Sequence, residues 1–137
     1  MRLWYLSHPQ VRIDPAVPVP DCVPHNRHEA LAHRFFAEPD LSADGWETAR
    51  AAQARVLADL RRALAEGPDG DTLVVGHGGV GTLILCHFAG LAPSRRHDQP
   101  AGGGNWFCVD PVAGAVIGPP VWQPVEAAAP AGVRRGP

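Results

Sequence analysis

A short apolar strand that runs directly into a glycine-rich turn is the feature that most constrains the fold of this chain. The strand is predicted over residues 72–76, and its centre, Leu73 to Val75, holds no polar side chain. Such a run is typical of a strand covered on both faces of a sheet. The turn from Gly76 to Gly79 then opens a helix predicted over 79–89. Strand, tight turn and helix in this order favour an α/β fold, in which ligands bind beyond the carboxyl ends of the strands.

A second predicted strand, over residues 2–7, also ends directly before a histidine, His8. If the two strands lie side by side, His8 and His77 reach the same crevice. The first N–H groups of the helix after His77 point to the same place, and the helix dipole favours an anion there. Two imidazoles beside free N–H groups therefore indicate chemistry on an anion, and we expect a phosphate. The alternative is that each histidine forms only local hydrogen bonds.

Two further helices are predicted between these strands. The first is expected over 27–38, with Asn26 as its N-cap and Glu29 as the reciprocal partner of that cap. The second is expected to begin at the N-cap Asp44, to follow a helical spacing of apolar residues, and to end at Gly67.

The last part of the chain predicts strands rather than helices. A strand is expected over 105–110, and a hairpin turn joins it to a short partner over 115–117. Four prolines make residues 14–24 an extended connection without regular structure. The predicted fold class is α/β, a three-layer α/β/α arrangement with a short, mostly parallel sheet.

Length and composition indicate one domain. Of the 137 residues, 1–123 are predicted to form it, and the Ala/Pro/Gly-rich residues 124–137 a flexible tail. A net charge of −2 argues against a nucleic-acid or membrane surface, and no apolar run has membrane-spanning length. The three cysteines, Cys22, Cys86 and Cys108, lie far apart without a metal or redox spacing, which fits a reduced cytoplasm.

Both histidine segments resemble motifs of a known family. Leu6-Ser7-His8-Pro9-Gln10 is similar to the Arg-His-Gly or Arg-His-Pro signature of the histidine phosphatase superfamily, whose fold is phosphoglycerate-mutase-like. Gly76-His77-Gly78-Gly79 is similar to the second histidine motif of that family. Further similarity, to one bacterial branch, covers residues 35–37, 45–49 and 95–107. The chain thus resembles a shortened, partly degenerate member with a reduced version of that fold.

The resemblance implies a role for each histidine. His8 would be the nucleophile that becomes phosphorylated, and His77 would bind the phosphoryl group. The implied substrate is a small phosphomonoester, hydrolysed through a phosphohistidine without a metal or other cofactor. The residues predicted to bind phosphate around the histidines are Ser7, Gly78, Gly79, Arg95 and Arg96. A solvated loop is the alternative interpretation of the two arginines.

Two departures from the family pattern leave the activity open. Ser7 stands where the family has an arginine, and a hydroxyl cannot hold phosphate oxygens as a guanidinium does. The longer block that normally separates the two histidine motifs, with a second arginine and an acidic proton donor, is missing. Three interpretations remain. The protein is a weak phosphohydrolase, a non-catalytic relative that binds a ligand or a partner, or a relative whose pocket serves different chemistry in a biosynthetic pathway. A shortened sheet also exposes apolar surface, so we expect a homodimer.

Overall fold

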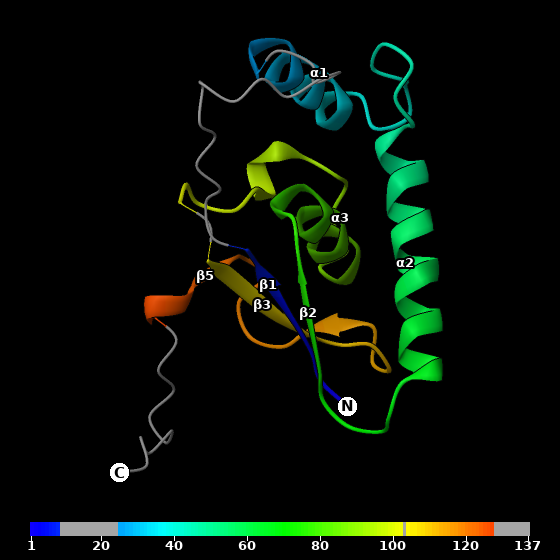
Figure 1. The fold of residues 1–137 in the computed structure, drawn as a ribbon, viewed down its shortest axis with the longest axis vertical. Helices are drawn as coiled ribbons and strands as arrows, with labels where there is room; N and C mark the ends of the chain where they lie inside the picture. The colour runs from blue at the N-terminus through cyan, green and yellow to red at the C-terminus, as the bar shows by residue number, and fades with distance from the viewer. Residues whose placement is uncertain (9–24, 103, 128–137) are drawn as a thin grey trace, which may run out of the picture.

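The structure is a computed structural model that describes residues 1–8, 25–102 and 104–127 (Figure 1). The connection predicted over 14–24 lies outside these residues. In chain order the elements are β1 (Leu3–Ser7), α1 (His25–Ala37), α2 (Ala49–Glu66), β2 (Thr72–Gly76), α3 (Gly78–Phe88), the 3-10 helix η1 (Arg95–His97), β3 (Asn105–Asp110), β4 (Ala115–Val116), β5 (Gln123–Pro124) and the 3-10 helix η2 (Val125–Ala127).

The sheet confirms the α/β class but is mixed rather than mostly parallel. Its order is β2-β1-β3-β4, and β5 also pairs with β3. Only β1 and β2 pair in parallel, whereas β3 runs antiparallel to β1, β4 and β5. The reason is the path of the chain after α3. After α3 the chain returns, over residues 89–102, towards the carboxyl ends of β1 and β2, so β3 enters the sheet from there and runs in the opposite direction.

One face of the sheet carries the main core. Leu3 and Tyr5 of β1 point to this face, and both are buried together with residues of α2, α3 and β3. Helix α3 packs on β1, and α2 packs along α3 (Figure 1). These helices therefore form a single layer over this face.

The other face of the sheet is open at β2. Leu73 is 62% exposed and Val75 is 58% exposed, so the prediction that this strand is covered on both faces is wrong. Strand β2 is the edge of the sheet, and among the described residues no helix covers its outer side chains. The second helical layer that the three-layer prediction requires is therefore not seen in the described part of the chain.

The N-caps of the two longer helices differ from the predicted ones. Helix α2 begins after Thr48, whose Oγ1 accepts a hydrogen bond of 3.1 Å from the Ala51 N–H. Asp44 lies in the preceding turn with a φ of 53°, and it cannot cap α2 because the helix starts five residues later. Helix α1 already includes Asn26, and its Glu29 forms an ion pair with Arg95 instead of closing a capping box.

The described chain ends where the predicted domain meets the predicted tail. Residues 123–127 form β5 and η2, and the Val125 N–H donates to the Gly104 carbonyl at 3.0 Å. The remainder of the predicted tail, 128–137, lies outside the described residues.

Close packing of α3 generates a prediction about two of its glycines. A Cβ on Gly81 would lie 2.6 Å from Tyr5 Cε1 and 2.7 Å from Trp122 Cζ2, whereas a Cβ on Gly79 would meet nothing within 4 Å. We expect Gly81→Ala to lower the free energy of unfolding by about 1–3 kcal/mol, because the buried rings must shift. The matched control Gly79→Ala is expected to leave it unchanged or slightly higher. Urea unfolding measures both, and equal stabilities of the two variants would contradict this packing.

Candidate active site

The parallel pairing of β1 and β2 brings the two predicted histidines together. Ser7 is in register with Gly76, so the next residue of each strand is a histidine at the same edge of the sheet. His8 Nε2 lies 2.7 Å from His77 Nδ1, and the two rings are perpendicular. One of these nitrogens donates and the other accepts, depending on the tautomers. His77 is exposed and His8 half-buried, so an anion can reach both rings from solvent.

The backbone around His77 is held by a buried phenol. The Tyr5 hydroxyl donates a hydrogen bond of 2.8 Å to the His77 carbonyl. A Cβ on Gly76 would lie 3.1 Å from Tyr5 Cζ, so glycine lets the phenol approach the turn this closely. Burial raises the pKa of Tyr5 to about 12, which keeps the hydroxyl a neutral donor. Tyr5 therefore positions the carbonyl from which the first turn of α3 starts.

The N-terminus of α3 offers amides to the space beside His77. His77 is the N-cap of α3 but its side chain makes no capping hydrogen bond. The first amide bonded within the helix is that of Gly81, which donates to the His77 carbonyl at 3.0 Å. The N–H groups of Gly78 and Gly79 therefore have no carbonyl acceptor in the helix, and the dipole favours an anion near them. Gly79 borders open space, as an approaching ligand requires.

Ser7 is used in the interior of the protein. It is 1% exposed, and its Oγ donates to the Asn105 carbonyl at 3.1 Å and accepts from the Asn105 N–H at 2.9 Å. The hydroxyl has one proton, and that proton is directed to Asn105. This geometry leaves Ser7 no proton to donate to a phosphate, so it does not support the predicted contact.

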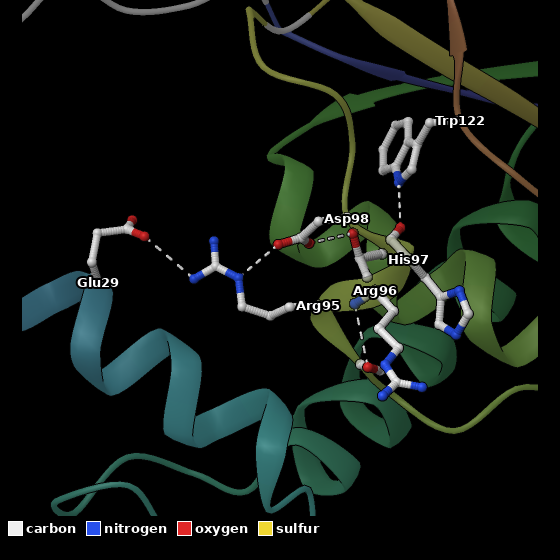
Figure 2. Close-up of polar contacts among 8 residues, drawn as sticks. Glu29, Arg95, Arg96, His97, Asp98 and Trp122 are labelled. Carbon is white, nitrogen blue, oxygen red and sulfur yellow. Dashed lines mark hydrogen bonds and ion pairs between the residues drawn. The ribbon is translucent and has the colours of Figure 1, made fainter.

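Arg95 is neutralised by carboxylates rather than directed at the histidines. Figure 2 shows its guanidinium between Glu29, whose Oε2 lies 3.3 Å from Nη1, and Asp98, whose Oδ2 lies 2.9 Å from Nε. Asp98 also accepts from Thr82 Oγ1 at 2.9 Å, so this network ties η1 to both α1 and α3. The carboxylates of Glu29 and Asp98 offset the positive charge of Arg95, which the predicted contact with phosphate needs.

Arg96 extends away from this network (Figure 2). Its side chain is exposed, and it lines a small cavity of about 130 Å³ together with His97 and Trp122. The contacts among the described residues thus place neither arginine against the histidine pair. A role for them in binding phosphate stays a prediction.

Three residues of the site were not expected from the sequence. The sequence marks Tyr5 only as part of a strand and Asn105 only as the start of another. Gln99 lies in a loop, and its side chain covers Gly78 at the start of α3. The signal that could have identified Asn105 is a polar residue at the start of an apolar strand, whereas no local pattern marks the other two.

Within ranges 1–8, 25–102 and 104–127, no group of three or more His, Cys, Asp and Glu side chains is arranged to hold a metal ion. None of the helices in this part of the chain is long and apolar enough to cross a membrane.

Comparison with known proteins gives one positive result. A family model described as the histidine phosphatase superfamily (branch 1) matches residues 21–110, which is about two thirds of the chain. The match includes His77 and Gln99 and begins after His8. A search of curated proteins finds no match.

The environment of Tyr5 gives a prediction that can be measured directly, because it is the only tyrosine in the sequence. Tyrosinate absorbance in the native protein is expected to appear with a midpoint near pH 12, against 10.0 for an ordinary tyrosine. The neutral form is favoured in the folded state, so its contribution to stability is complete below pH 10 and is lost as the pH rises towards 12. The denatured protein is the control, and a native midpoint near 10 would show that this hydroxyl is not buried.

Proposed function

The chain belongs to the histidine phosphatase superfamily, and on that premise we propose that it hydrolyses a small phosphomonoester through a phosphohistidine at His8. The observation that carries the proposal is the 2.7 Å contact between His8 Nε2 and His77 Nδ1 at the N-terminus of α3. When an imidazole attacks phosphorus, the phosphoryl oxygens need a hydrogen-bond donor nearby. His77 lies next to His8 and can be that donor. A phosphoryl group would enter by replacing the hydrogen bond between the two rings.

The reaction follows from these positions in two steps. Neutral His8 attacks phosphorus with the lone pair of Nε2, so an N–P bond forms as the ester P–O bond breaks. The leaving alkoxide takes up a proton from solvent, to which the pair is open. Water then attacks the phosphohistidine, the N–P bond breaks, and inorganic phosphate leaves. His77 and the first amides of α3 donate to the phosphoryl oxygens throughout, which stabilises the charge of the transition state.

The proposed turnover is slow, because among the described residues no arginine is seen against the histidine pair. Ser7 keeps its proton for Asn105, and Glu29 and Asp98 offset Arg95. Each missing preorganised donor typically costs about a hundredfold to a thousandfold in rate. The same observations support the second candidate, a relative that binds phosphate or another anion without turning it over.

For the setting of the protein we propose a cytoplasmic location and a small anionic metabolite as ligand, with neither nucleic acid nor membrane as partner. A second copy of the chain is the proposed protein partner. The support is the edge strand β2, where Leu73 and Val75 are more than half exposed beside unpaired backbone groups. Pairing with a second sheet edge would satisfy these backbone groups and place neighbouring side chains beside Leu73 and Val75.

Loss of the nucleophile tests the proposed reaction. With a chromogenic phosphomonoester and no added metal, we expect slow release of inorganic phosphate by the wild-type protein. His8→Ala is expected to lower that rate at least about a hundredfold, because the variant lacks the nucleophile that forms the N–P bond. The matched control is His33→Ala, an exposed histidine of α1, which should leave the rate unchanged. Equal rates for wild type and His8→Ala would rule out the phosphohistidine, and no turnover by any variant would favour the binding protein.

Assembly is tested at the sheet edge. Light scattering at tens of micromolar protein is expected to give the mass of a dimer. Val75→Lys should shift the protein towards monomer, because it places a charge in the proposed contact. Val112→Lys, in a turn where the valine is 84% exposed, is the control and should leave the mass unchanged. A wild-type monomer at this concentration would refute the dimer.

A further inference from the structure

The side chain of Gln99 lies directly on the first residue of α3. A Cβ on Gly78 would overlap Gln99 Nε2 and would lie 2.8 Å from its Cδ and 3.2 Å from its Cγ. With Gln99 in this position, a side chain at residue 78 would displace the carboxamide. The carboxamide thus lies beside the N-terminus of α3, whose first residue, Gly78, follows His77 in the sequence.

The orientation of this carboxamide is set by Asn105. Asn105 Nδ2 donates to Gln99 Oε1 at 3.3 Å and to the Pro100 carbonyl at 3.2 Å. The backbone of Asn105 is in turn bound on both sides by the buried hydroxyl of Ser7. Since Oε1 accepts from Asn105, the NH2 group is the end that faces Gly78.

This orientation places like partial charges together when no anion is present. The N-terminus of α3 is the positive end of its dipole, and the Gln99 NH2 group presents two more positive hydrogens to it. Among the described residues, no hydrogen-bond acceptor is found for Nε2. An anion bound at this end of the helix would accept from both and relieve the repulsion.

We propose that Gln99 donates from Nε2 to the phosphoryl group held by His77, as a neutral donor beside the helix amides. The proposal rests on the proposed function, and it deepens that function by naming a ligand contact. Ser7 and Asn105 act as positioning residues, because they hold the Gln99 amide and do not reach the anion. The site would thus recognise phosphate by imidazole, helix amides and one carboxamide.

Inorganic phosphate is the probe for this contact, followed by amide NMR on the full chain. In the wild-type protein, the side-chain NH2 resonances of Gln99 and the backbone amide of Gly79 should shift with one common dissociation constant. The NH2 resonances of Gln123, which lies in β5, should not shift, because that amide donates to the Val121 carbonyl. This measurement needs no variant and so does not depend on whether a variant folds.

Substitution of Gln99 then distinguishes a contact with phosphate from a role in packing alone. Gln99→Leu is expected to weaken phosphate binding about tenfold to a hundredfold, the worth of one hydrogen bond to a charged group. Gln99→Glu keeps the shape but puts a carboxylate beside the anion, so it should weaken binding further. Gln123→Leu is the matched control and should bind as the wild type does. A merely structural glutamine would change unfolding by urea and leave the dissociation constant unaltered.

The outcomes distinguish this contact from the proposed hydrolysis. Unshifted Gln99 resonances, or a dissociation constant of Gln99→Leu within about twofold of wild type while His77→Ala abolishes binding, would overturn the contact and leave the hydrolase intact. Binding that depends on Gln99 without phosphomonoester turnover would sustain the contact and remove the hydrolase. A wild-type protein that does not bind phosphate would overturn both.

Discussion

The parallel pairing of β1 with β2 is the interaction on which the rest of the site depends. It places Ser7 opposite Gly76, and both histidines then follow at one edge of the sheet. A slip of one residue would send every side chain of β1 to the opposite face. Burial of Leu3 and Tyr5 under α3 resists such a slip, because it would expose both side chains. The hydrophobic core therefore fixes the spacing of the two imidazoles.

The glycines around His77 serve different purposes. Gly76 lets the Tyr5 phenol approach, Gly78 makes room for Gln99, and Gly81 packs against Tyr5 and Trp122. Only Gly79 borders open space. Most of the turn is thus a packing arrangement that holds His77 and the helix start in place, with one residue open to a ligand. This division explains how a turn so rich in glycine can still position a side chain, since its backbone is held by neighbours on three sides.

The electrostatics of the site separate binding from turnover. Arg95 joins α1, η1 and α3 through Glu29 and Asp98, so its charge is used to hold helices together. Among the described residues, the donors near the histidine pair are the imidazoles, the helix amides and, beside Gly78, the Gln99 carboxamide, which are neutral or weakly charged. Such donors can bind an anion, but they stabilise the charge of a phosphoryl transition state less than guanidinium groups do. If the proposed function is correct, the contacts that stabilise the fold also leave a phosphate site with little catalysis.

The sequence alone determined the elements whose signal is local. Strands β1 and β2, helix α3 and the hairpin after β3 follow from apolar runs, glycine and proline, and the two histidines follow from the ends of those strands. The cap of α2 was predicted wrongly because Asp44 and Thr48 are equally suitable residue types. Only the backbone of the preceding turn, with Asp44 at positive φ, selects between them.

The tertiary structure decided what depends on distant partners. The direction of β3 depends on where the segment after α3 returns, and the exposure of β2 depends on its place at the sheet edge. Arg95 pairs with Glu29 across 66 residues, and Ser7 with Asn105 across 98. No periodicity or spacing encodes such contacts, because they arise only when separate elements pack together. The sequence therefore located the histidines, and the packing determined which neighbouring groups are free to act with them.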